Sequence, residues 1–306
     1  MRKIEAIPTI RKAFSCVIAH PKVVIPFFIF FLITSFIFVY AFNRFFEFFH
    51  VFLSSREPLP GDVFQTVFGF LALIFLVILV SVFVFPFFEG WTFATAVLAC
   101  KNDPVSLKKA CRKALSKYLG VLVISIIVAF ASAAIGSVVW PILFLLVFPV
   151  DFPSTVPYTP FPLSSVFYRL FMAYGLVFLI VTIFIVLFVY LKPAYILGDK
   201  SLVDSLNDGF ATARKNFIPS CLVYLFFSVL QILLYVGGAI LVFTTIDFEN
   251  LWLIEDFSSG YEVIQAELES LLPVVLVGVF VYFLLYSILY TALAHAYMDS
   301  HEIVTG

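Results

Sequence analysis

Long apolar segments separated by short polar ones dominate the pattern of this chain. A helix needs about 20 mostly apolar residues to cross the hydrocarbon core of a bilayer. Six segments meet this length, at roughly 23–42, 64–88, 119–148, 167–191, 218–243 and 271–297, and their centres hold no ionisable side chain. The alternating strands of about 10 residues that form an outer-membrane barrel are not part of the pattern. We therefore predict an all-α integral membrane protein, with six transmembrane helices in a single polytopic domain over residues 1–306.

Composition narrows the class of protein further. Hydrophobic residues make up 63% of the 306 residues and charged residues only 12%, with 41 Phe. A soluble globule with so few polar side chains has too little polar surface to face water. The same numbers exclude disordered, collagen-like and nucleic-acid-binding classes, which need polar or basic sequence. We expect no nucleic-acid partner.

The distribution of charge predicts the orientation in the membrane. Lys and Arg in short loops mark the cytoplasmic side. Seven acids lie between Asp247 and Glu269, on the opposite side of the predicted spans. Fifteen of the 18 Lys and Arg residues fall in the N-terminal segment and the two connections on its side: Arg2, Lys3, Arg11, Lys12, Lys22, Lys101, Lys108, Lys109, Arg112, Lys113, Lys117, Lys192, Lys200, Arg214 and Lys215. We predict a multi-pass protein of the cell (plasma or inner) membrane with both termini in the cytoplasm.

Three polar segments share a 3-4-3-4 spacing of apolar or small residues. The positions are Ile7, Ile10, Phe14, Val17 and Pro21, then Pro104, Leu107, Cys111, Ala114 and Tyr118, then Val203, Leu206, Phe210, Ala213 and Phe217. This spacing places one stripe along a helix face, as in an interfacial amphipathic helix. Each segment precedes a pair of predicted spans. The pattern predicts three tandem repeats of an amphipathic helix plus a membrane hairpin, at about 1–99, 100–199 and 200–306.

The ends of the first and third segments carry a resemblance to a known group. The stretches Ala13-Phe14 through His20-Pro21-Lys22 with Pro26, and Gly209-Phe210 through Asn216-Phe217 with Pro219, resemble those of a broad prokaryotic family of six-helix membrane proteins of unknown function. This family includes the membrane domain attached to some glycerophosphoryl diester phosphodiesterases. The resemblance implies the fold and a membrane role. It implies no catalytic residue, because this chain has no soluble hydrolase domain.

Ionisable groups at the ends of spans are candidates for function, since burying a charge in a membrane is costly. Glu89 follows Pro86, which should kink the helix, and has apolar residues on both sides. It either lines a vestibule or is an interfacial carboxylate paired with a neighbouring Lys. Lys192 and His295 lie at similar points of their repeats. The three side chains either form a polar ring at one depth or extend separately to the interface.

The last span has a stripe of hydroxyl groups. Tyr282, Tyr286 and Tyr290 recur every fourth residue and so share one face, with Gly278 above them. They either line a central cavity or pack between helices. Gly237 and Gly238 in the fifth span suggest close helix contact.

No motif indicates an enzyme, a metal site or a cofactor. The phosphate-binding loop, the H-E-x-x-H zinc helix and the G-x-S-x-G elbow are missing, and His20, His50, His295 and His301 have no Cys or carboxylate cluster at ligand spacing. Cys16, Cys100, Cys111 and Cys221 show no C-x-x-C pair, and we expect reduced thiols that pack as small apolar residues. The predicted protein is therefore non-enzymatic, with no catalytic or metal-binding residue and no cofactor.

Two functional hypotheses follow. In the first, the protein has a lipid-associated or membrane-assembly role, and basic interfacial helices contact anionic headgroups of the bilayer. The contacts would come from Lys108, Lys109, Arg112, Lys113, Lys117, Arg214 and Lys215. In the alternative, a transporter-like or permease-like subunit moves a neutral or amphipathic solute, or a lipid, through a cavity between the hairpins. That cavity would be lined by Glu89, Lys192, His295, Tyr282, Tyr286 and Tyr290. A membrane-protein partner or a homo-oligomer is compatible with both.

Overall fold

The computed structural model describes residues 2–54, 60–101, 103–147, 180–198, 200–245 and 257–301, and these residues form helices and short connections without a strand. The α-helices are α1 (Ala6–Ala19), α2 (Ile25–Ser54), α3 (Pro60–Leu79), α4 (Phe85–Cys100), α5 (Leu107–Val147), α7 (Leu191–Leu197), α8 (Leu202–Lys215), α9 (Phe217–Thr245) and α11 (Phe257–Ser300). A 3₁₀ turn, η1 (Pro21–Val24), precedes α2, and a π-helical turn, η2 (Val80–Val84), joins α3 to α4.

The six apolar helices predicted from the sequence are present. The described segments long and apolar enough to cross a membrane are Pro21–Ala41, Val67–Cys100, Leu107–Val139, Ile180–Leu197, Phe217–Gly238 and Glu269–Ser300. The predicted fourth span begins at residue 167, and its part before Ile180 lies outside the described residues. The all-α architecture and the multi-pass membrane class are therefore confirmed.

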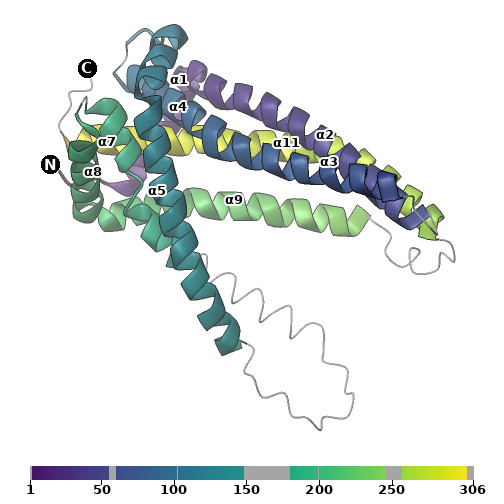
Figure 1. Ribbon diagram of the computed structural model, residues 1–306. Helices are drawn as coiled ribbons and strands as arrows, with labels where there is room; N and C mark the ends of the chain where they lie inside the picture. Colours follow the sequence, from purple (N-terminus) through teal and green to yellow (C-terminus); the bar gives the residue numbers. More distant parts are fainter. Residues whose placement is uncertain are drawn as a thin grey trace.

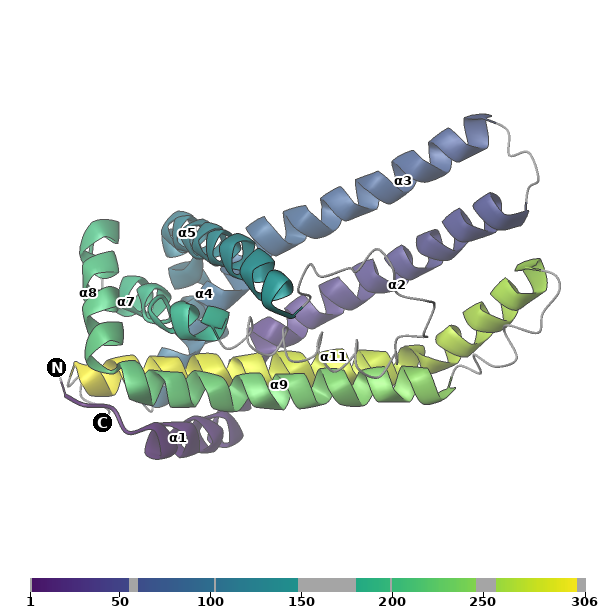
Figure 2. The same ribbon diagram turned by 90° about the horizontal axis from the view of Figure 1, so that it is seen from below.

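The described helices gather at one end of the molecule, where both chain termini lie (Figure 1). We call this the terminal end and define it by α1, α4, α7, α8, the first turns of α5 and the C-terminal end of α11. From it α2, α3, α9 and α11 extend in a common direction, whereas α5 runs off at an angle (Figure 1). Figure 2 shows α9 beside α11, and the two helices are in contact.

Three segments of the chain share the 3-4-3-4 spacing, and in two of them the helix is interrupted before the long apolar helix begins. Pro21 begins η1 after α1, and its missing N–H forces a change of hydrogen bonding there. Asn216 is a non-helical residue between the end of α8 at Lys215 and the start of α9 at Phe217. The segment 104–118 differs, because α5 continues from Leu107 to Val147 as one helix. Its expected boundary, near Tyr118, has no proline to stop the helix.

The exposure of side chains on α8 fits a helix that lies at the edge of the bundle. Its buried residues are small, namely Ser205, Gly209, Thr212 and Ala213, and the apolar side chains of Val203 and Phe210 are exposed. Ser201 caps its first turn by accepting a hydrogen bond from the backbone N–H of Asp204 at 3.2 Å.

Glycine permits the closest approach between helices at two positions. A Cβ at Gly209 would lie 2.9 Å from the Cα of Leu191, which shows that α8 rests directly on the backbone of α7. A Cβ at Gly120 would lie 2.2 Å from the ring of Tyr195. No described atom lies within 4 Å of such a Cβ at Gly237 or Gly238, so the close contacts fall elsewhere than the sequence suggested.

The core between α2, α4 and α11 is aromatic. The Phe27 ring lies 5.4 Å from that of Tyr290 and 6.0 Å from that of Phe283, measured between centroids. Phe30 adds contacts to Phe88 at 5.3 Å and to Phe283 at 5.4 Å. These tilted, stacked and edge-on pairs are typical of aromatic cores. They pack α4 and α11 against α2, and α4 and α11 carry two residues of the candidate site, Glu89 and Tyr290.

Candidate functional site

Glu89 is the centre of a buried polar cluster. It lies in the second turn of α4 with 3% of its surface exposed. Lys192 of α7 donates a hydrogen bond to its Oε2 atom, and Tyr290 of α11 donates one to Oε1. Ser125 of α5 donates a third, at 3.4 Å to Oε2. Four separate helices thus meet at one carboxylate.

The cluster compensates its own charge. Lys192 is mostly buried and forms an ion pair with Glu89, so the two formal charges cancel inside the helix bundle. A buried ion pair is weak evidence for net stability, but removing one partner leaves an uncompensated charge that costs about 3–5 kcal/mol. Of the two alternatives given for Glu89, the structure shows a pair with a Lys, formed by a buried carboxylate. The partner is Lys192, which the sequence placed 103 residues away.

Pro86 lies one helical turn before Glu89 and coincides with a change of helix type. The π-helical turn Val80–Val84 ends just before it. Single π-turns inside α-helices occur frequently at functional sites. The carbonyl of Phe83 accepts a hydrogen bond from the hydroxyl of Tyr118 at 2.8 Å, which gives this disturbed stretch a partner in α5.

The predicted tyrosine stripe leads away from Glu89 along α11. The rings of Tyr286 and Tyr290 are 5.7 Å apart, and the hydroxyl of Tyr282 donates to that of Tyr286 at 3.2 Å. Tyr235 of α9 continues the series, with its ring 5.4 Å from Tyr282. The stripe therefore connects the Glu89 cluster to the far part of the bundle.

A cavity of about 530 Å³ lies at the other end of this stripe, between α2, α3, α9 and α11. Small-molecule sites typically have about 300–1,000 Å³. Most of its lining is apolar, and the polar contributors are few: Thr34, Ser35, Ser81, Tyr235 and Tyr282. Apart from Leu241, its lining residues belong to segments that are long and apolar enough to lie within a membrane. We call it the intramembrane cavity.

The six side chains predicted to line one cavity lie at different sites in the structure. Tyr282 lines the intramembrane cavity, whereas Glu89, Lys192 and Tyr290 form the cluster at the other end of the tyrosine stripe. Tyr286 lies between them. Of the three side chains in the alternative polar ring, Glu89 and Lys192 form an ion pair. His295 is not bonded to this pair and lies beside Cys16 and Cys100 instead.

The predicted headgroup contacts differ in exposure. Lys108, Lys109 and Arg112 are exposed at the start of α5, and Arg214 and Lys215 are exposed at the end of α8. Lys113 and Lys117 are partly buried, and the ammonium group of Lys117 lies 4.8 Å from the centre of the Tyr195 ring. The five exposed side chains on α5 and α8 are therefore more accessible than Lys113 and Lys117.

A second polar cluster, which the sequence did not indicate, closes the terminal end. Asp208 of α8 accepts a hydrogen bond from the hydroxyl of Tyr297 at 2.5 Å and contacts His301 at 3.1 Å and Lys200 at 3.1 Å. Burial raises the pKa of Asp208, but the bonds from Tyr297, His301 and Lys200 outweigh that effect and hold the pKa below its ordinary value. The cluster ties α8 to the end of α11.

Comparisons with protein-family models, with curated proteins and with solved structures found no match to this chain.

Proposed function

We propose that this chain is a non-enzymatic multi-pass membrane protein with a lipid-associated role, and that its intramembrane cavity binds the apolar chain of a lipid-like molecule. The observation that carries the proposal is the cavity itself, about 530 Å³ in volume and lined mainly by apolar side chains of α2, α3, α9 and α11. In a bilayer the surrounding medium consists of acyl chains. A molecule that enters this space is therefore apolar over most of its length.

The few polar groups of the cavity favour an amphipathic ligand over a pure hydrocarbon. Tyr235 and Tyr282 place two phenols side by side on one wall. Pockets of this kind use a small number of placed polar groups to orient a mostly apolar ligand. An ester or hydroxyl group of a lipid matches the hydrogen-bonding capacity of these phenols.

The cavity offers a clean experiment because two glycines differ only in their location. A Cβ at Gly278, which lines the cavity, or at Gly136 on α5 would meet no described atom within 4 Å. Gly278→Leu fills the cavity, and Gly136→Leu is the matched control. Both changes replace Gly by a better helix former, so neither is expected to weaken its helix.

The measurement is photo-crosslinking in vesicles that contain a phospholipid with a diazirine on its acyl chain. We expect crosslinks on the cavity walls of α9 and α11, and a loss of about tenfold in Gly278→Leu, equivalent to about 1.4 kcal/mol of binding. Gly136→Leu should label like the wild type. Equal labelling of all three proteins would contradict the proposal.

A second lipid contact is proposed at the terminal end. Lys108, Lys109 and Arg112 lie exposed on one turn of α5, and each basic residue near an anionic surface contributes about 1 kcal/mol. We assign this end to the cytoplasmic side, with both termini inside the cell, because Lys and Arg concentrate there. Replacing these three residues and Lys113 by Gln should remove the preference for anionic over zwitterionic lipid in native mass spectrometry. An unchanged preference would contradict this contact.

Transport of the bound molecule is the alternative function. It is favoured by the tyrosine stripe, which continues from the cavity to Glu89 and so approaches the terminal end. Passage would require the Glu89–Lys192 pair to open. The test is the rate at which a fluorescent lipid crosses the bilayer of proteoliposomes, compared between the wild type and Glu89→Gln. If the rate with both proteins equals that of empty vesicles, transport is refuted and lipid binding is the function that remains.

Three internal repeats at about 1–99, 100–199 and 200–306 are part of the same proposal. The short helices α1 and α8, each followed by a break and then a long apolar helix, support the first and third units. The second unit has the same spacing in the first turns of α5, without a break. A membrane-protein partner or a second copy of the chain fits this arrangement.

A further inference from the structure

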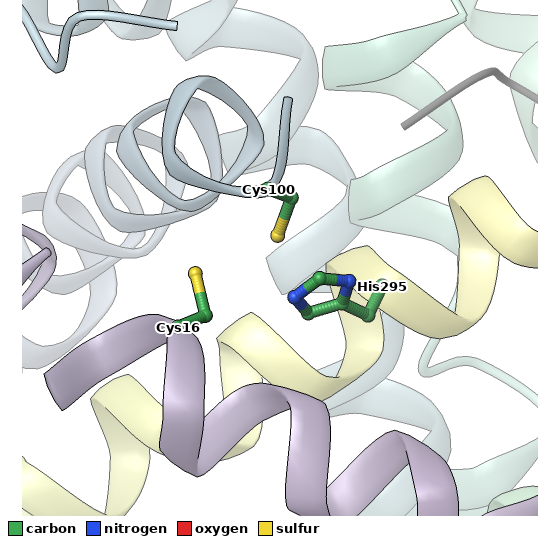
Figure 3. Close-up of side chains that lie close together, drawn as sticks. All are labelled: Cys16, Cys100 and His295. Carbon is green, nitrogen blue, oxygen red and sulfur yellow. The ribbon is translucent and has the colours of Figure 1, made fainter. Parts of the chain in front are cut away.

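Three soft metal ligands from distant parts of the chain meet at the terminal end. Cys16 of α1, Cys100 at the end of α4 and His295 of α11 point toward one another (Figure 3). Their two sulfurs and a ring nitrogen all lie within 4.8 Å of one another. We propose that Cys16, Cys100 and His295 form a binding site for a thiophilic metal ion, with Zn²⁺ as the ion that fits best.

The distances are close to those of a metal site. Zinc binds thiolate sulfur at about 2.3 Å and imidazole nitrogen at about 2.1 Å, which separates tetrahedral ligand atoms by about 3.7 Å. The present spacing exceeds this by about 1 Å at most, and small side-chain rotations of two Cys and one His close such a difference.

The environment of His295 is an independent indication of a ligand. Its side chain is 7% exposed, and among the described residues neither ring nitrogen has a hydrogen-bond partner. A buried imidazole without partners is unfavourable, because its lost hydration is not replaced. A metal bond to one nitrogen removes this deficit at that nitrogen. Cys16 and Cys100 are buried to a similar degree, at 9% and 6% exposed.

The chemistry of the three side chains selects the class of metal. Two thiolates and one neutral imidazole carry a charge that matches a divalent ion, and sulfur ligands favour zinc and related soft ions over Mg²⁺ or Ca²⁺.

A second cavity gives the site access from the solvent side. It has a volume of about 510 Å³ and is lined by Cys16, Cys100 and His295 together with His20 and Ser15. It supplies the fourth, open position of a tetrahedral site and an entry path for the ion. Arg11 and Lys12 also line it, and Lys12 is ion-paired with Asp299 at 2.8 Å, which reduces the repulsion that the charge of Lys12 exerts on a cation.

The test uses the full-length protein in detergent, reduced and freed of metal, with Zn²⁺ and Co²⁺ as probes. We expect one equivalent of Zn²⁺ to bind, and Co²⁺ to give the absorption bands of thiolate-to-metal charge transfer. Cys16→Ser, Cys100→Ser and His295→Gln should each weaken binding by at least about tenfold. The chain provides matched controls in Cys111→Ser and Cys221→Ser, which should bind as the wild type does.

A footprint on the wild-type protein keeps the proposal testable if a variant fails to fold. One equivalent of Zn²⁺ should protect Cys16 and Cys100 from alkylation and leave the reactivity of Cys111 and Cys221 unchanged, as read by peptide mass spectrometry. Absence of stoichiometric binding, protection of all four cysteines alike, or a Cys16–Cys100 disulfide that forms equally with and without Zn²⁺ would overturn it. These outcomes do not depend on whether lipid enters the intramembrane cavity.

Discussion

The terminal end and the intramembrane cavity share the long helix α11, but they are built in opposite ways. At the terminal end, polar groups from different helices bond to one another, as at Glu89 and Asp208. Around the cavity, the walls are mainly apolar and the two phenols of Tyr235 and Tyr282 are the largest polar groups. The contrast indicates that one end fixes the arrangement of the helices and the other leaves room for a ligand.

The difference follows from what each region can gain by packing. Within a bilayer, apolar helices gain little from burying apolar surface, because lipid is equally apolar, and association depends on close packing and on hydrogen bonds between helices. Directed bonds such as Lys192 to Glu89 therefore determine which helices meet. Substitutions at matched positions of the two regions should separate these contributions.

The largest effect is expected from breaking the buried ion pair. Lys192→Met leaves the carboxylate of Glu89 buried without its countercharge, and we expect the free energy of unfolding in micelles to fall by about 3–5 kcal/mol. The double variant Glu89→Gln with Lys192→Met removes both charges and should recover most of that loss. A Lys192→Met protein as stable as the wild type would show that the terminal end does not depend on this pair.

The pH dependence of the Asp208 cluster is the next effect in size. The pKa of Asp208 lies below its ordinary value, so the cluster stabilises the protein fully above the unfolded pKa of about 3.9 and loses that stabilisation as the pH falls through the folded pKa. Asp208→Asn should cost about 2 kcal/mol at neutral pH.

The measurement is denaturant unfolding of the wild type and Asp208→Asn between neutral and acid pH. Their difference should shrink once the pH falls below about 4. Asp103→Asn, at an exposed position, is the control and should change stability by less than about 0.5 kcal/mol. A difference between the two proteins that is the same at every pH would contradict the role given to Asp208.

Removing one hydroxyl in each region compares them directly. Tyr290→Phe deletes a hydrogen bond to the charged carboxylate of Glu89, which we expect to cost about 1.5 kcal/mol or slightly more. Tyr282→Phe deletes a neutral bond to Tyr286 beside the cavity and should cost about 0.5–1 kcal/mol. Thermal unfolding of both variants tests the ranking, and the reverse order would refute the contrast between the regions.

The last comparison concerns a single methyl group. Gly209→Ala presses a Cβ against the backbone of Leu191, where overpacking costs about 1–3 kcal/mol, but Ala favours the helix by nearly 1 kcal/mol. We expect a net loss of about 1 kcal/mol. Gly237→Ala meets no described atom and should be neutral or slightly stabilising in the same unfolding assay. Equal effects at both positions would show that α7 and α8 separate easily.

The sequence predicts the features of this fold that depend on one segment at a time. The six apolar helices follow from hydropathy, and the common face of Tyr282, Tyr286 and Tyr290 follows from their spacing. Features that depend on how helices meet could not be predicted. Ser125 has nothing in its surroundings along the chain to single it out.

The two clusters at the terminal end illustrate the same limit. Asp208 and Tyr297 are 89 residues apart, and Cys16, Cys100 and His295 belong to three different helices. Glu89 differs from these residues, because its neighbours in the sequence already single it out: a carboxylate between apolar residues next to a span requires a partner. The identity of that partner depended on the position of α7 relative to α4.

The bonds at the terminal end also constrain the order in which the protein can be completed. The backbone N–H of Ile4 donates to the side chain of Asn216, 212 residues later, at 3.0 Å, and the N–H of Arg2 donates to the carbonyl of Ser300 at 2.8 Å. Residues 2–4 therefore bond to segments that are synthesised about 200 to 300 residues later. Until Asn216 and the end of α11 are in place, these two backbone N–H groups lack the partners that hold them in the finished fold.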